Sequence, residues 1–278
     1  MYVQGVSTRR VKEITQQLCG LEISSTDVSR ATKALDELLS KWRNRTLGKY
    51  KYFYFDARYE KVRQDGCVVS SAVFIAFGVD SEGKRRILGT SVSLSEHEVH
   101  WRNFFTSLIE RGLHGIELII SDAHAGLKAA REAIFPSIPW QRCQFHLQQN
   151  AQSYVTKQNM KREVATDIRS ILQAANAEEA KRLLDITVKK YQNKSQKLAL
   201  WMEGNIPESL TVMKFPEQHR RRIRTSNVAE RVNKEIRRRT KVVGIFPNPE
   251  SCLRLVTAMT MEIDEEWQEG MVYLSIDN

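Results

Sequence analysis

The sequence has few cysteines, and the four that it contains lie far apart in a chain of 278 residues. This spacing provides neither the dense disulfide framework of a small secreted domain nor a Cys-x-x-Cys zinc site. We therefore expect reduced thiols at all four positions, which are Cys19, Cys67, Cys143 and Cys252.

Long hydrophobic runs are also missing. The longest run, residues 72–79, spans eight residues, whereas a membrane-spanning helix needs roughly 18–20. Residues 1–7 lead directly into charged sequence and do not form a signal-peptide pattern. The sequence thus predicts a cytoplasmic protein without a membrane partner.

Positive charge is abundant and unevenly distributed. The chain has 43 Lys and Arg against 33 Asp and Glu, a net charge of +10. Much of this excess falls in residues 220–241, where ten arginines and lysines accompany only two glutamates. A surface this basic typically binds a polyanion, because each phosphate that it neutralises releases condensed counterions. The charge pattern therefore favours nucleic acid as the partner.

The N-terminal residues 1–48 are expected to be helical. Apolar residues recur at helical spacing over residues 7–20 and 25–43, with a short connection between them. Such a pair can be a helix-turn-helix, whose second helix enters the major groove of DNA. An ordinary helical hairpin fits the pattern equally well.

The periodicity changes to that of an α/β fold from residue 50 onward. Strands are predicted at residues 52–55, 67–79 and 86–93, and the turn residues between them indicate an antiparallel meander. The chain then alternates between helices and strands, which predicts parallel strands added to the meander. The expected elements are a helix at 97–111, a strand at 116–121, a helix at 124–134 and a strand at 140–143.

No strand pattern recurs between residues 146 and 214. Polar-faced helices are predicted there at 161–175, 177–191 and 195–203, so this stretch is expected to be an all-helical insert. Helix is predicted again over 227–239, and after Asn248, which can cap a helix whose first residue is Pro249.

Three carboxylates stand at positions that suit chemistry on DNA. Asp56 and Asp122 each follow a predicted strand, and Glu230 lies in the basic segment. Each has a simpler explanation, because Asp is a common turn former and Asn227 with Glu230 fits a capping box. Taken together, they can hold two Mg²⁺ or Mn²⁺ ions, hard cations that prefer oxygen ligands and stabilise both oxygens of an in-line displacement at phosphorus.

Four blocks of the sequence resemble the Mutator-like DDE transposases of bacterial insertion sequences. They are residues 54–63, 121–127, 141–146 and 225–247. The resemblance implies an RNase H-like core over residues 49–278, with a mixed five-stranded sheet, flanking helices and an insertion at about 147–215. It also implies that Asp56, Asp122 and Glu230 form the catalytic triad that binds the metal ions.

The same resemblance implies the reaction and its partners. Such enzymes cleave DNA at the ends of an element and join the freed 3′-hydroxyl to target DNA. The expected partners are therefore the terminal inverted repeats, target DNA and a second copy of the chain, since two ends must be brought together. Members of the family usually begin further upstream, so part of the region that binds the terminal repeats is expected to be missing from this chain.

Further residues are singled out by the family blocks and by charge. Cys143, His146 and Asn227 match family signatures; Cys143-x-x-His146 resembles half a zinc site, but without a second pair we favour a structural or DNA-positioning role. The basic residues are either a solvated face or, as their clustering around Glu230 favours, phosphate contacts. The predicted DNA-binding residues are Arg58, Arg63, Arg224, Arg231, Lys234, Arg237, Arg238 and Arg239.

Three alternatives stay open at the level of sequence. The same core could belong to a metal-dependent nuclease that cuts DNA without strand transfer. The chain could also be a non-catalytic DNA-binding protein that descends from a transposase. Finally, Trp201 could be exposed and stack on an unpaired base, although a tryptophan is more often part of a core.

Overall fold

A mixed five-stranded sheet organises the chain in the computed structural model, which describes residues 25–155 and 158–276. The strand order is β3-β2-β1-β4-β5. β2 runs antiparallel to both β1 and β3, while β1, β4 and β5 are parallel. The antiparallel meander and the added parallel strands are thus confirmed. The strands are β1 (Tyr50–Gln64), β2 (Cys67–Asp80), β3 (Arg85–Ser93), β4 (Leu118–Ser121) and β5 (Trp140–Arg142).

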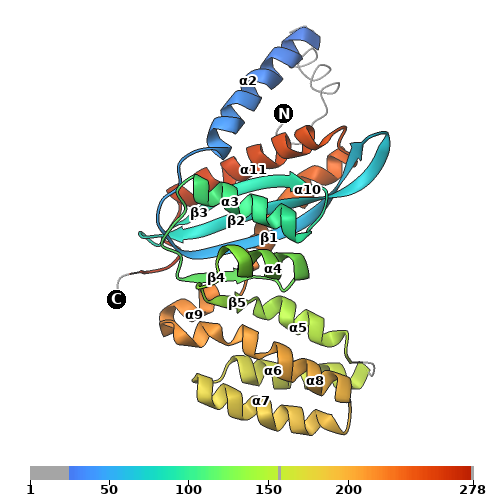
Figure 1. The fold of residues 1–278 in the computed structure, drawn as a ribbon, viewed down its shortest axis with the longest axis vertical. Coiled ribbons are helices and arrows are strands. Elements are labelled where there is room, and N and C mark those ends of the chain that lie inside the picture. The colour runs from blue at the N-terminus through green and yellow to red at the C-terminus, as the bar shows by residue number, and fades with distance from the viewer. Residues whose placement is uncertain (1–24, 156–157, 277–278) are drawn as a thin grey trace.

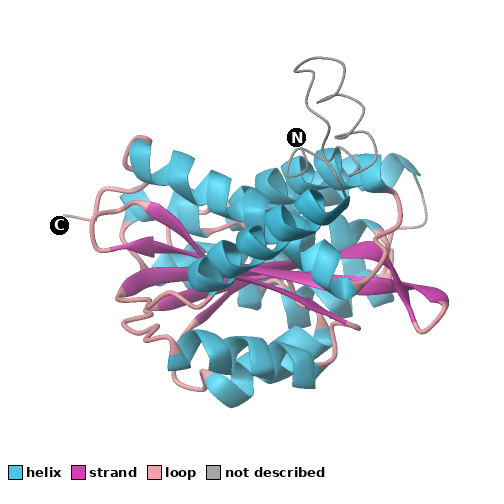
Figure 2. Cartoon of the chain, turned by 90° about the horizontal axis from the view of Figure 1, so that it is seen from above, coloured by secondary structure: helices cyan, strands magenta, loops and turns pink. Residues whose placement is uncertain are grey.

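Alternating side chains on β1 build two cores, one on each face of the sheet. Phe53 and Phe55 pack with α3 (Glu98–Glu110) and α4 (Ala125–Ile134). Tyr52 and Tyr54 point to the other face, which α9 (Glu217–Ile223), α10 (Asn227–Val243) and α11 (Pro249–Glu269) cover. Successive strand residues point to opposite faces, so one aromatic run supplies both cores. Figure 2 shows helices on both sides of the strands.

Four further helices lie beyond the β5 edge of the sheet (Figure 1). They share an apolar cluster that is separate from the two cores on the sheet. Trp201 belongs to this cluster, is 9% exposed, and stacks on Tyr154 with a centroid distance of 5.3 Å. The core interpretation of Trp201 therefore holds. The helices are α5 (Gln144–Gln152), α6 (Gln158–Leu172), α7 (Ala177–Gln192) and α8 (Gln196–Asn205).

Helix α2 (Ser25–Arg43) is the second of the two predicted N-terminal helices, and it lies against α11. Asp36 accepts two hydrogen bonds from Arg254, at 2.6 and 2.7 Å, and Leu39 is buried. The predicted helix at 7–20 lies outside the described residues, so the helix-turn-helix stays a prediction. No helix in the described part of the chain is long and apolar enough to cross a membrane.

Candidate active site

The parallel pairing of β1 and β4 brings two carboxylates to the same level of the sheet. Tyr52, Phe53 and Tyr54 pair with Leu118, Ile119 and Ile120. Asp56 and Asp122 each stand two residues beyond the last of these pairs. The carboxyl end of β4 is where open α/β sheets commonly bind ligands. The register of two neighbouring strands therefore explains why these aspartates are close.

The prediction that Asp56 ends its strand is wrong. β1 continues through Asp56 to Gln64, because its antiparallel pairing with β2 extends as far as Gln64 and Cys67. What ends near Asp56 is the parallel pairing on the other side of β1, since β4 is only four residues long. Asp122 does directly follow its strand, as predicted.

Glu230 lies in the first turn of α10, which does not begin with the predicted capping box. Ser226 is the N-cap residue, without a side-chain capping bond, and Asn227 is the first helical residue. The capping role of Asn227 is therefore wrong. A buried hydrogen bond fixes the residue before the helix instead: the Ser226 amide donates to Cys143 Sγ at 3.3 Å.

Two hydrogen bonds donated by backbone amides bring α5 beside the start of α10. Besides the Ser226 amide, the Gln144 amide donates to the Arg224 carbonyl at 3.0 Å. As a result, His146 Nε2 on α5 lies 3.9 Å from Glu230 Oε1 on α10. The Cys143-x-x-His146 signature thus connects β5 to Glu230 within a single turn of helix.

His146 is surrounded by negative charge. Burial lowers its pKa, but Cys143, Asp122 and Asp56 together outweigh this effect and raise the pKa to about 9. Burial raises the pKa of the Cys143 thiol, yet His146 and the Ser226 amide bring it below its usual value. At neutral pH His146 therefore carries a positive charge beside Glu230.

Asp56 and Glu230 are half-buried, and both carboxylates bind protons more readily than usual. Loss of hydration raises the pKa of Asp56 to about 7, with a further contribution from repulsion by Asp122, although His146 and the Ala57 amide oppose the rise. Burial also raises the pKa of Glu230, again against the effect of His146. Groups with such shifts are typical of functional sites.

Asn233 is a site residue that the sequence argument missed. Its Nδ2 donates to Asp56 Oδ2 at 2.8 Å, and its backbone carbonyl accepts a hydrogen bond from Arg58. Asn233 follows Glu230 by three residues, a spacing that places both on one side of a helix. That spacing was the available signal, but nothing in the sequence links Asn233 to Asp56.

A second segment next to Asp122 was also missed. His124 Nδ1 lies 3.7 Å from Glu96 Oε2. Gly126 approaches the same segment so closely that a Cβ atom there would be 2.2 Å from the Glu96 carbonyl oxygen. The loop after β4 is therefore packed tightly against the residues that precede α3.

The donor set suits a hard divalent cation, but the side chains are not arranged around one. Within residues 25–155 and 158–276, no three His, Cys, Asp or Glu side chains stand close enough together to hold a metal ion. Glu230 Oε1 is nevertheless buried without a hydrogen-bond partner. A buried carboxylate oxygen without a hydrogen-bond partner fits the role of a cation ligand. Binding of a shared metal ion would require the side chains of Asp56, Asp122 and Glu230 to approach one another.

The predicted DNA-binding residues divide into two groups. Three form ion pairs. Arg58 is 13% exposed and contacts Glu60 at 2.6 Å; Arg238 contacts Glu235 at 2.7 Å; and Arg239 contacts Glu235 and Glu262 at 3.0 and 2.6 Å. Arg58 is therefore directed into the protein. Arg239 joins α10 to α11.

The other predicted DNA-binding residues are available to a ligand. Four of them are exposed and form no ion pair with another described residue, namely Arg63, Arg231, Lys234 and Arg237. The last three follow Glu230 along α10, whose apolar side is buried against the sheet. Arg224 is half-buried and lines a cavity.

Comparisons with known proteins agree on one family. The family model for Transposase, Mutator family, matches residues 1–270. A transposase for insertion sequence element IS406 of Burkholderia multivorans is 56% identical, with 100% of this chain and 72% of that protein aligned. The ISRM5 transposase of Rhizobium meliloti is 42% identical, with 100% of this chain and 70% of that protein aligned. The IS256 transposase in transposon Tn4001 of Staphylococcus aureus is 38% identical, with 100% of this chain and 72% of that protein aligned.

Proposed function

Because the chain belongs to the Mutator family of transposases, we propose that it cleaves DNA at the ends of an insertion sequence and joins the freed 3′-hydroxyl to target DNA. Its partners are then the terminal inverted repeats, the target DNA and a second copy of the chain that holds the other end. One site serves both steps, because each is an in-line attack on a phosphodiester by an activated oxygen.

The grouping of Asp56, Asp122 and Glu230 around His146 carries this proposal. Glu230 lies 3.9 Å from His146, and the charges of both aspartates raise the pKa of the same imidazole. The three carboxylates come from a strand, a strand end and a helix that are remote in sequence. Exposed cations continue along α10 from this point and can hold a phosphate backbone.

We propose that the carboxylates of Asp56, Asp122 and Glu230 hold two Mg²⁺ or Mn²⁺ ions. When bound, such ions stabilise the attacking and leaving oxygens at phosphorus. Asn233 orients the Asp56 carboxylate through its hydrogen bond. His146, positively charged at neutral pH, offsets part of the repulsion between the three carboxylates as they approach one another.

We also propose that the sheet is an RNase H-like core. The order β3-β2-β1-β4-β5, with β2 antiparallel to both neighbours, supports this assignment. Helices α5 to α8, with their own apolar cluster, then correspond to the insertion between the second and third carboxylates. The insertion then contributes a residue to the candidate active site, since α5 carries His146.

A cleavage and joining assay tests the proposal. The protein is incubated with Mg²⁺ or Mn²⁺, a labelled duplex of the element end and a plasmid target. We expect cleavage and joining by the wild type, neither by Asp122→Asn, and both by Asp185→Asn, which removes an exposed carboxylate of α7. Binding without cleavage would contradict the enzyme function, and cleavage without joining would indicate a nuclease.

Metal binding has a readout that does not depend on activity. A ligand that binds only the folded state raises the unfolding temperature. We expect Mn²⁺ to raise the unfolding temperature of the wild type and of Asp185→Asn, but not that of Asp122→Asn. Equal shifts for all three proteins would contradict the assignment of Asp122 as a ligand.

A further inference from the structure

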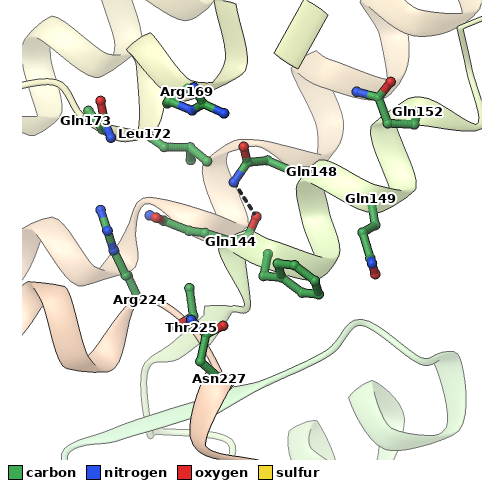
Figure 3. A pocket seen from close by; sticks show the side chains of 11 residues that line it. Gln144, Gln148, Gln149, Gln152, Arg169, Leu172, Gln173, Arg224, Thr225 and Asn227 are labelled. Atoms are coloured by element: carbon green, nitrogen blue, oxygen red, sulfur yellow. Dashed lines mark hydrogen bonds between the residues drawn. The ribbon is translucent and has the colours of Figure 1, made fainter. Parts of the chain in front are cut away.

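A cavity of about 500 Å³ lies next to the candidate active site. Its walls come from α5, from the C-terminal end of α6 and from the segment that leads into α10, as Figure 3 shows. Its volume falls within the roughly 300–1,000 Å³ typical of small-ligand sites. Both α5 and α10 also carry a residue of the candidate active site, namely His146 and Glu230.

The lining of the cavity is rich in amides and positively charged. Four glutamines of α5 and Gln173, which directly follows α6, face it together with Arg169 and Arg224, and no Asp or Glu lines it. Neither arginine forms an ion pair with another residue in the described ranges. Amides both donate and accept hydrogen bonds and can pair with base edges, while guanidinium groups bind phosphate. This combination is suited to a nucleotide.

An aromatic side chain connects the cavity to the active site. Phe145 lines the cavity, is 38% exposed, and has its ring centroid 5.5 Å from that of His146. Exposed aromatic rings in nucleic-acid-binding proteins are platforms on which bases stack. A base on Phe145 would therefore be adjacent to the residue that contacts Glu230.

We propose that this cavity binds one unpaired nucleotide of the DNA strand end beside the bond that is cut. This inference rests on the proposed function and adds a substrate site to it. The base stacks on Phe145 and meets the glutamine amides, and the flanking phosphates contact Arg169 and Arg224. The cavity thereby positions the strand end relative to Glu230.

Binding of labelled duplexes in EDTA tests this site without any chemistry. One duplex is blunt, and the other has the same sequence with a three-nucleotide unpaired 3′ end. We expect the wild type to bind the unpaired end about tenfold more tightly than the blunt end, as one stacked base would produce. Phe145→Ala and Arg169→Gln should reduce this ratio to about one.

Arg162→Gln is the matched control, because it removes one exposed charge from α6 at a position that does not line the cavity. We expect it to keep the wild-type ratio. The proposal is overturned if the wild type shows no preference for the unpaired end, or if Phe145→Ala and Arg169→Gln keep the preference. A loss of affinity that is equal for both duplexes would also overturn it.

Cross-linking provides a measurement that needs no variant. A 4-thiothymidine at the unpaired end is irradiated in complex with the wild type, and the adduct is mapped by mass spectrometry. We expect the adduct on α5 or on residues 224–227, and an adduct confined to other segments would refute the site. Neither assay involves metal or cleavage. A wild-type protein that prefers the unpaired end tenfold but neither cleaves nor joins DNA would therefore refute the proposed function and still support the nucleotide site in the cavity.

Discussion

Asn233 donates a hydrogen bond from Nδ2 to Oδ2 of Asp56 at 2.8 Å, across 177 residues of sequence. This bond connects α10 to β1 at the candidate active site. Three residues earlier on the same helix is Glu230. The position of one proposed metal ligand is thus tied to the helix that carries another.

Replacement of Asn233 by Ala should slow DNA cleavage without weakening DNA binding. The hydrogen bond stabilises the charged carboxylate, so its loss should reduce the cleavage rate about tenfold and raise the pKa of Asp56 further. The acid limb of the rate profile should therefore move to higher pH. Cleavage rates from pH 6 to 9 check this. An unshifted limb would indicate a purely structural role for Asn233.

Arg58→Ala should destabilise the fold rather than affect DNA contacts. Glu60 is 9% exposed and would lose its ion pair, retaining the hydrogen bond from Thr240. Removing one partner of a buried pair typically costs about 3–5 kcal/mol, and we expect about 3 kcal/mol here. Urea unfolding measures the loss. Arg63→Ala, at an exposed position of the same strand, should change stability by less than about 0.5 kcal/mol.

Glu235→Gln should strengthen DNA binding. Hydrogen bonds from Arg238 and Arg239 lower the pKa of Glu235 to about 2, so it is charged under all ordinary conditions. Its replacement releases Arg238, while Glu262 still holds Arg239. We expect a salt dependence that is steeper by about one counterion. Fluorescence anisotropy against KCl concentration measures it, with Glu178→Gln on α7 as the control that should leave the slope unchanged.

Asp56→Asn should stabilise the metal-free protein at alkaline pH while it abolishes cleavage. Burial raises the folded-state pKa of Asp56 to about 7, whereas unfolding restores a value near ~4. Between these values the folded state binds the extra proton, so stability falls as the pH rises through this range. At pH 8 we expect the variant to be more stable by about 4 kcal/mol, with little difference near pH 4.

Urea unfolding in EDTA at the two pH values measures this difference. Adding Mn²⁺ should then stabilise the wild type and leave Asp56→Asn unchanged. A variant that is less stable than the wild type at pH 8 would show that the Asp56 charge is already compensated in the metal-free protein.

Local sequence patterns predicted the number and order of the strands along the chain, but not the full length of β1. Turn residues such as Asp65 and Gly66, both of which have positive φ, separate β1 from β2. Asn248 caps α11 by accepting a hydrogen bond from the Ser251 amide at 2.8 Å, and Pro249 follows as the first helical residue. These turn and capping signals act over two to four residues. Together with the periodicity of apolar residues, they therefore locate the elements along the chain.

The site depends on contacts that no local pattern records. The start of α10 is fixed by Cys143, 83 residues earlier, and not by Asn227. The continuation of β1 beyond Asp56 depends on β2, which pairs with it over its whole length. Whether an arginine is free or paired also depends on distant carboxylates, as Glu262 shows for Arg239. Charge counts alone could not make that distinction.

Helix α10 has a consequence for where a DNA strand would be cut. Glu230 and the exposed Arg231, Lys234 and Arg237 share one rigid rod that advances about 1.5 Å per residue. In the proposed function, the cations that bind the DNA backbone thus keep a fixed distance from the proposed metal ligand. Inserting a single alanine after Glu230 would rotate the cations by about 100° around the axis. Because Val232 and Ile236 of the same helix are buried in the core, the insertion would displace them as well, so the spacing between Glu230 and the cations cannot change without disturbing the packing of α10.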